Sequence, residues 1–213
     1  AVGADALLVS TTGQRNVAVG YTALDAATTG SDNAVVGAYA GTAVTTGIEN
    51  TLLGYYAGAA ITTADYNTGV GSGALQNNTA GTNTAVGRTA MYATTTGTDN
   101  TAMGYAALDA NTTGSRNTAI GYQSLSGVTT GNDNVALGRR AGLTITTGNK
   151  NTAIGTNSLW YNTTGDKNTA LGDGALHLTT TGQNNTAIGL NAGFSNTTGE
   201  NNVFVGYKAC NND

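Results

Sequence analysis

The chain has 213 residues, only 9% of them are charged, and its formal net charge is −4. This composition argues against a nucleic-acid-binding protein, because that class needs a basic stripe on its surface. No run of about 18 apolar residues occurs, so no segment is expected to span or enter a membrane.

One pentapeptide, Asn-Thr-Ala-Ile-Gly at residues 117–121, recurs with small changes along the whole chain. The closing glycines of its thirteen copies fall at 3, 20, 37, 54, 71, 87, 104, 121, 138, 155, 172, 189 and 206. Every step is 17 residues except the step from Gly71 to Gly87, which is 16, because a single residue separates Gly81 from Asn83 where other repeats have two. A fixed short period predicts one elongated repeat domain, residues 1–213, in which each unit contacts only its neighbours.

The residues before each closing glycine are typical of a short strand. The residue directly before the glycine is apolar in all thirteen copies and is mostly β-branched. Seventeen residues are too few for a helical hairpin but enough for two short strands and two turns. The sequence therefore predicts an all-β fold, a parallel β-solenoid (β-roll) of about thirteen coils with two strands each, stacked about 4.8 Å apart.

An asparagine stands four residues before the closing glycine in all twelve units that contain the position. Stacked coils would place these side chains in one column, where amides pair along the axis. We expect a structural ladder and not a catalytic role. Its central members are Asn100, Asn117, Asn134, Asn151, Asn168 and Asn185.

The second half of each unit leads into Thr-Thr-Gly. The first threonine is present in twelve of twelve units, and the exceptions at the other two positions are Ala80 and Ala64. The two residues that follow carry much of the charge, as Asp32, Arg116 and Lys150 do, which indicates a solvated turn.

Bulky residues interrupt this monotony in the later coils. Leu143, Trp160, His177 and Phe194 occupy one column in four successive units, with Tyr161 beside them. Two interpretations stay open: a filled corner or subunit contact, and a platform for a cell-surface receptor or glycan. A second aromatic column, which includes Tyr105 and Tyr122, lies one residue past the glycines and predicts stacking between coils.

The stretch Asn117–Leu125, Asn-Thr-Ala-Ile-Gly-Tyr-Gln-Ser-Leu, resembles the head repeats of YadA-type trimeric autotransporter adhesins. It is similar also to the repeats of phage tail fibres that precede endosialidase-type chaperone domains. The resemblance extends over all thirteen units and implies a left-handed β-roll assembled as a side-by-side trimer, working in adhesion or as a fibre.

Reactive residues are too few for catalysis. The single histidine, His177, and the single cysteine, Cys210, lie two coils apart in different columns, so no triad can form. Zinc needs several Cys or His ligands, and calcium-binding repeats are absent, so we expect no enzyme, metal site or cofactor. Cys210 stands in a column otherwise rich in leucine and is interpreted as a small apolar substitute; an inter-chain disulfide is the alternative.

The strand pattern leaves two orientations open. If the asparagine and alanine columns face inward, the long aliphatic column faces outward and must be covered by a neighbour; if the aliphatic column faces inward, a flat alanine and glycine face remains. Both favour self-association. The first residues, Ala1-Val2-Gly3, begin inside a strand, so we expect either head-to-tail stacking into a filament or a fragment of a longer rod.

Taken together, these features predict a non-enzymatic structural fibre protein that self-assembles end to end, side by side, or both. Low charge, abundant Thr, Asn and Gly, and one cysteine are typical of an extracellular, cell-surface or virion-surface location. The alternative is the receptor-binding head of a trimeric adhesin or tail fibre. A more remote one is an ice-binding protein, which needs two outward threonine columns on one face. An Ile120→Asp change is expected to break cooperative unfolding.

Overall fold

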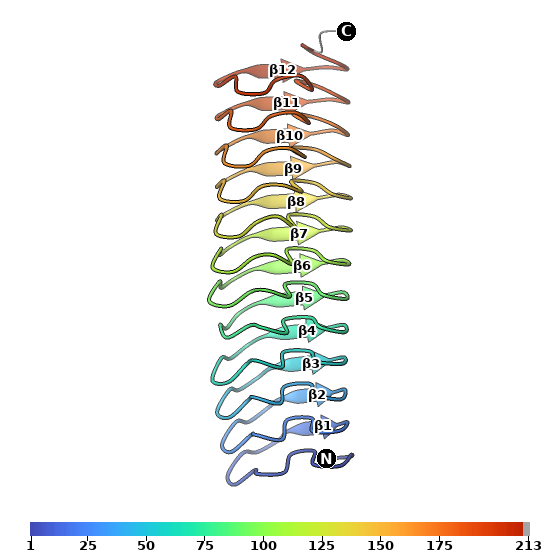
Figure 1. Ribbon diagram of the computed structural model, residues 1–213, viewed down its shortest axis with the longest axis vertical. Helices are drawn as coiled ribbons and strands as arrows, with labels where there is room; N and C mark the ends of the chain where they lie inside the picture. The colour runs from blue at the N-terminus through green and yellow to red at the C-terminus, as the bar shows by residue number, and fades with distance from the viewer. Residues whose placement is uncertain (211–213) are drawn as a thin grey trace.

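The computed structural model describes residues 1–210, and its strands stack into one straight parallel β-solenoid (Figure 1). Twelve strands form a single sheet in sequence order, and an isolated bridge from Val2 to Val19 precedes them. The strands are β1 (Val17–Val19), β2 (Ala34–Val36), β3 (Thr51–Leu53), β4 (Thr68–Val70), β5 (Thr84–Val86), β6 (Thr101–Met103), β7 (Thr118–Ile120), β8 (Val135–Leu137), β9 (Thr152–Ile154), β10 (Thr169–Leu171), β11 (Thr186–Ile188) and β12 (Val203–Val205). The predicted all-β solenoid with a 17-residue repeat is confirmed, while thirteen coils were too many: twelve strands are separated by eleven turns.

Each coil of the described chain holds one strand, not the two expected. The segment after the closing glycine alternates between right-handed and left-handed backbone, with Ala106 at φ 50° and Leu108 at φ 54°. The Ala106 amide donates to the Arg88 carbonyl in the coil before, and the Leu108 amide donates to the Ser124 carbonyl in the coil after, both at 3.0 Å. This segment is bonded from coil to coil, but it must also reverse the chain within a few residues, which extended backbone cannot do.

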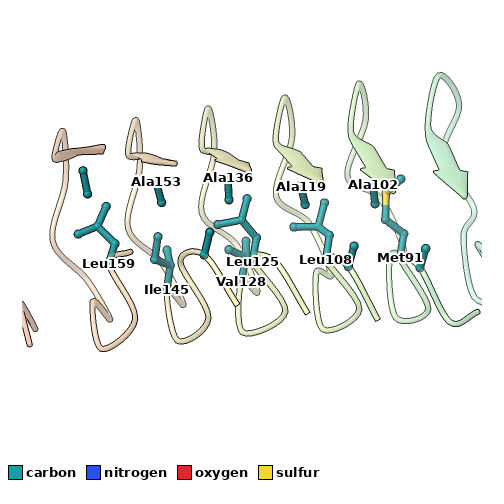
Figure 2. Close-up of a cluster of buried hydrophobic side chains, with 14 of the residues drawn as sticks. Met91, Ala102, Leu108, Ala119, Leu125, Val128, Ala136, Ile145, Ala153 and Leu159 are labelled. Atoms are coloured by element: carbon teal, nitrogen blue, oxygen red, sulfur yellow. The ribbon is translucent and has the colours of Figure 1, made fainter. Parts of the chain in front are cut away.

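The core is a single layer between the strand and this returning segment (Figure 2). Ala119 and Ala136, at the centres of β7 and β8, point inward toward Leu108 and Leu125, and all four side chains are fully buried. Small residues suit the strand centre because the leucines opposite already fill the space.

Glycine replaces leucine in the returning segment where larger side chains already fill the core beside it. Leu52 occupies the centre of β3, and a Cβ added at Gly58 would lie 2.6 Å from Leu52 Cδ2 and 2.9 Å from Ile61 Cδ1. The same exchange occurs at Gly193, which faces Phe204 of β12. The irregular glycines of this column therefore conserve core volume.

The 16-residue coil is accommodated by two compensating residues. At the third residue of Thr-Thr-Gly a Cβ normally collides with the coil above, as at Gly97, where it would overlap the Gly114 carbonyl oxygen. In the shortened turn Gly81 lies over Asp65 instead, where an added Cβ would be 2.8 Å from the Asp65 carbonyl oxygen, and the preceding coil carries Ala64 at the position usually held by glycine.

Asn78 repairs the asparagine ladder at the same place. Its Nδ2 donates to Asn67 Oδ1 at 3.2 Å, and its Oδ1 accepts from Asn83 Nδ2 at 3.2 Å. Asn78 thus bridges Asn67 and Asn83. In coils of ordinary length the side-chain amides of the two ladder asparagines bond to each other directly. Its Nδ2 also donates to the Ala80 carbonyl at 2.6 Å.

We expect Asn78→Ala to lower the free energy of unfolding by about 2 kcal/mol, because it removes several hydrogen bonds from a buried network. Asn111 is the matched control, since it lies in the same column, is equally buried, and donates only to Gly114 at 3.0 Å. Asn111→Ala should lower the stability by about 1 kcal/mol or less. Urea titrations followed by circular dichroism measure both; equal losses would show that Asn78 does not link the ladder.

Candidate functional site

The asparagine ladder is an internal feature of the rod, with every side-chain hydrogen-bonding group satisfied. Asn117 Nδ2 donates to Asn100 Oδ1 at 3.2 Å and to the Gly131 carbonyl at 2.9 Å. Its Oδ1 accepts from the backbone amide and the Nδ2 of Asn134, at 2.9 and 3.1 Å. The same pattern continues through Asn151, Asn168 and Asn185. These groups have no remaining capacity for a ligand, so the ladder stabilises the stack.

The largest uniform surface is the outer side of the sheet, which we call the sheet face. It consists of the first and last residue of each strand, because only the central residue points inward. The last residues form the aliphatic column, and several are well exposed, with Met103 and Leu137 both at 47%. The twenty-four outward positions of β1–β12 include no charged residue.

This arrangement decides between the two orientations that the sequence left open: asparagine and alanine face inward, and the aliphatic column faces outward. Ile120 is accordingly half-buried on the sheet face, whereas Ala119 beside it is fully buried. The core position in β7 is Ala119 and not Ile120, so an Ile120→Asp change is no longer expected to break cooperative unfolding.

The sheet face also carries a column of threonines at the first residue of most strands. Its members are Thr51, Thr68, Thr84, Thr101, Thr118, Thr152, Thr169 and Thr186. They are half-buried or exposed. The threonines of the Thr-Thr-Gly arm behave differently, because the first of most pairs donates its hydroxyl to the next coil, as Thr112 does to the Thr129 carbonyl at 3.0 Å.

The turns that precede the strands line one long side of the rod, which we call the turn edge. This side carries ion pairs between coils. Arg116 Nε and Nη2 contact the two carboxylate oxygens of Asp133 at 2.7 and 3.1 Å, and Arg15 pairs with Asp32 in the same bidentate way. The guanidinium groups hold the pKa of Asp133 and Asp32 below its usual range. Because these pairs are solvent-exposed, they contribute little to stability.

A shallow groove of ≈ 330 Å³ lies on this edge. It is lined by Arg116, Asn132, Asp133, Asn149, Lys150, Asp166 and Lys167. Much of the lining is already bonded from coil to coil: Asn132 Oδ1 accepts the Ser115 amide at 2.9 Å, and Asp166 Oδ1 accepts the Asn149 amide at 2.6 Å. These bonds extend the stack along the turn.

The segments that follow the closing glycines line the other long side of the rod, which we call the aromatic edge. Most of the bulky residues that the sequence singled out lie together there. The rings of His177 and Phe194 stack with centroids 4.8 Å apart and planes at 8°, and Trp160 lies 5.5 Å from His177. Tyr161 meets His177 edge-on at 5.5 Å. Leu143 is half-buried in the same column, one coil before Trp160.

Neighbouring coils cover ring faces in the column of Trp160, His177 and Phe194. His177 and Phe194 cover one another, and the Arg140 guanidinium lies 5.3 Å from the centre of Trp160. A sugar platform needs open ring faces, so this geometry favours the filled-corner interpretation of the column over the receptor or glycan platform.

The sequence reading missed Arg140 as a link in this edge. Its guanidinium lies between the rings of Tyr122, at 5.9 Å, and Trp160, at 5.3 Å, and its Nε donates to Gln123 Oε1 at 3.2 Å. Arg140 follows the closing glycine by two residues, whereas Tyr122 follows by one and Trp160 by five. Only the packing shows that these three columns meet.

The remaining reactive side chains do not converge. His177 Nδ1 contacts the Asn157 carbonyl at 3.1 Å, and Cys210 is an exposed free thiol. Within residues 1–210 no group of three or more potential metal ligands occurs. The same part of the chain holds no helix that is long and apolar enough to cross a membrane.

Fold and surfaces define a class of protein: a β-solenoid repeat protein with an uncharged outer sheet face. Comparison with protein-family models, with curated proteins and with solved structures finds no match.

Proposed function

We propose that this protein is a non-catalytic structural subunit that associates side by side with further copies of itself through the sheet face, as a component of an extracellular or surface fibre. The observation that carries the proposal is the outward aliphatic column, which runs uncovered along all twelve strands. Contiguous exposed apolar surface of this extent is typical of protein–protein interfaces.

The size of the sheet face suits a second copy of this chain. Twelve strands about 4.8 Å apart and three residues wide give a face of roughly 58 by 10 Å. Two such faces in contact would bury roughly 1,200 Å² in total, which lies at the lower limit of specific, stable interfaces.

The shape and charge of the face support the same occupant. The parallel register is unbroken from β1 to β12, so the face presents one ridge of side chains for every coil. A second copy has ridges of identical spacing and can interdigitate along the full length. Because the face is uncharged, no ionic group is desolvated in the contact.

We expect the double variant Ile120→Asp/Ile154→Asp to lose self-association while it keeps the melting temperature of the monomer. Both side chains point outward from β7 and β9, so the added carboxylates stay hydrated in the isolated chain but would be buried between two copies. Light scattering coupled to size exclusion measures the mass. The measured mass also gives the number of copies in the assembly, and the resemblance to trimeric adhesin head repeats implies three.

The matched control is Thr113→Asp/Thr147→Asp, which adds the same charge to exposed positions of the Thr-Thr-Gly arm. It should associate like the wild type. A wild-type chain that remains monomeric at high micromolar concentration, or a control that dissociates equally, would overturn the proposal. Electron microscopy adds a further distinction, because long unbranched threads would indicate end-to-end assembly and short thick rods the lateral one.

Ice binding is the second candidate, favoured by one observation. The sheet face combines a regular threonine column with an aliphatic column on a flat, uncharged surface, although its pattern is Thr-x-aliphatic and not Thr-x-Thr. A thermal-hysteresis measurement separates the two candidates. Activity that persists in a monomeric wild-type chain and disappears in Thr118→Asp would favour ice binding over self-association.

A further inference from the structure

Tyrosine rings from successive coils lie against one another at two places on the aromatic edge. Tyr105 and Tyr122 are stacked with ring centroids 5.4 Å apart and planes at 13°. Tyr39 and Tyr56 are stacked at 4.7 Å and 12°. Each pair joins two adjacent coils, because its members follow consecutive closing glycines at the same distance.

The Tyr105–Tyr122 pair is exposed to solvent while the stack holds the two rings close, and the rings of Tyr39 and Tyr56 are half-buried. Tyr105 and Tyr122 are exposed to 42% and 45%. The guanidinium of Arg88 lies 5.7 Å from the ring of Tyr105, and that of Arg140 lies 5.9 Å from Tyr122, so a cation stands at each end of this pair.

The other pair belongs to a cluster of four tyrosines. Tyr55 meets Tyr56 edge-on at 4.5 Å, and Tyr21 meets Tyr39 edge-on at 5.3 Å. Tyr21 and Tyr55 are exposed to 48% and 54%, so an oxidant in solution reaches the cluster at these two rings, which contact the half-buried Tyr39 and Tyr56.

We propose that Tyr105–Tyr122 and Tyr39–Tyr56 are modification sites at which one-electron oxidation forms a dityrosine bond between adjacent coils. The co-reactant class is a peroxidase acting on hydrogen peroxide. This inference is independent of self-association, because both rings of each pair belong to one chain.

Two phenols and one hydrogen peroxide react to give one dityrosine and two waters. Each phenol of a pair gives one electron and its hydroxyl proton to the oxidant, which leaves two phenoxyl radicals. The two radicals join through a carbon ortho to each oxygen, forming one C–C bond. Each joined carbon then loses its hydrogen as a proton, and each oxygen regains one, so the net change is the loss of two hydrogens from the pair and the conversion of one peroxide to two waters.

Selectivity arises from proximity. Coupling of two radicals is bimolecular in solution, but rings held in contact react as neighbours within one molecule at a high effective concentration. Tyr66 and Tyr92 are exposed to 54% and 39%, yet neither stacks on another ring within the described chain. They are equally open to oxidation and lack the geometry for coupling.

The dityrosine bond would run along the long axis of the rod, from one coil to the next, where the polypeptide backbone is the only other covalent connection. Successive coils are joined by backbone hydrogen bonds and side-chain ladders, so a bond from Tyr105 to Tyr122 closes a loop of one coil. A closed loop has fewer unfolded conformations, so the cross-linked chain should unfold at a higher denaturant concentration than the untreated chain.

The test treats the dilute Ile120→Asp/Ile154→Asp chain, and separately the wild type, with a peroxidase and hydrogen peroxide. Dityrosine fluorescence gives the yield, and mass spectrometry of the digested chain identifies the joined peptides. We expect both pairs to be linked within one chain at a rate independent of protein concentration. Tyr122→Phe should abolish the Tyr105 cross-link and leave the Tyr39–Tyr56 product unchanged.

Tyr66→Phe is the control and should leave both products unchanged. We expect cross-links that involve Tyr66 or Tyr92 to be at least about tenfold rarer than those of the stacked pairs. Cross-links distributed according to exposure alone, or products that form only between chains, would overturn the proposal. Because Phe keeps the ring, Tyr122→Phe should fold normally, and its melting curve verifies this. Self-association is measured separately, from the mass of the untreated chain, so failure of that proposal is distinguishable from failure of this one.

Discussion

Asn117→Asp is expected to unfold the middle of the rod, with a loss of about 3–5 kcal/mol in the free energy of unfolding. Asn117 is fully buried, and its Nδ2 donates two hydrogen bonds, to Asn100 Oδ1 and to the Gly131 carbonyl. A carboxylate would replace this donor with an acceptor that faces two other acceptors, and it would bury an unpaired charge.

The matched control is Asn184→Asp, which makes the same chemical change on the surface. Asn184 is exposed at φ 56°, in a column where Asp32, Asp99 and Asp133 already occur with similar backbone. Urea unfolding of this control should match the wild type. The loss in Asn117→Asp should shrink at acidic pH, because a protonated carboxyl can donate one of the two missing bonds. Equal stability of the two variants at neutral pH would contradict the role assigned to the ladder.

Gly121→Ala is the second change with a large expected effect, a loss of at least about 3 kcal/mol. Gly121 has φ 131°, a conformation that residues with a side chain rarely adopt, and a Cβ added there would lie 2.5 Å from the carbonyl oxygen of Gly138 in the next coil. The closing glycine is thus required both by backbone conformation and by the close approach of the coil above.

Gly206→Ala separates these two causes. Gly206 has φ 119°, but a Cβ added there meets nothing within 4 Å. Its substitution should cost about 1–3 kcal/mol through backbone strain alone. The excess loss in Gly121→Ala then measures the collision between coils. If the two variants unfold at the same urea concentration, the close stacking of coils is not what selects glycine at this position.

Much of the fold could be predicted from the sequence because a short exact period leaves few ways to stack a chain. The recurrence of Asn117 and Ile120 every 17 residues predicted a parallel stack, and the pairing of Thr118 with Thr101 and with Val135 confirms it. The second strand of each coil could not be predicted correctly. Residues such as Leu108 and Leu125 suit a strand by composition, but in the described chain they adopt left-handed backbone to reverse direction.

The candidate surfaces could be predicted only in part. Stacking of Trp160, His177 and Phe194 follows from their shared column, since equivalent residues of adjacent coils must lie close together. The contact of Arg140 with Trp160, and the pairing of Tyr39 with Tyr56, depend on how columns pack across the corner. No periodicity encodes that packing.

The stacking of this protein follows from residues that recur at fixed spacing, which give the period, the asparagine ladder, the small strand centres and the charged turns. Which side of each strand faces the interior depends instead on packing between distant parts of a coil. The alternation of side chains in a three-residue strand is compatible with burial of either face. Which face is buried depends on the leucines of the returning segment. These side chains fill the interior opposite alanine and leave no room there for Ile120, which therefore stays outside on the sheet face.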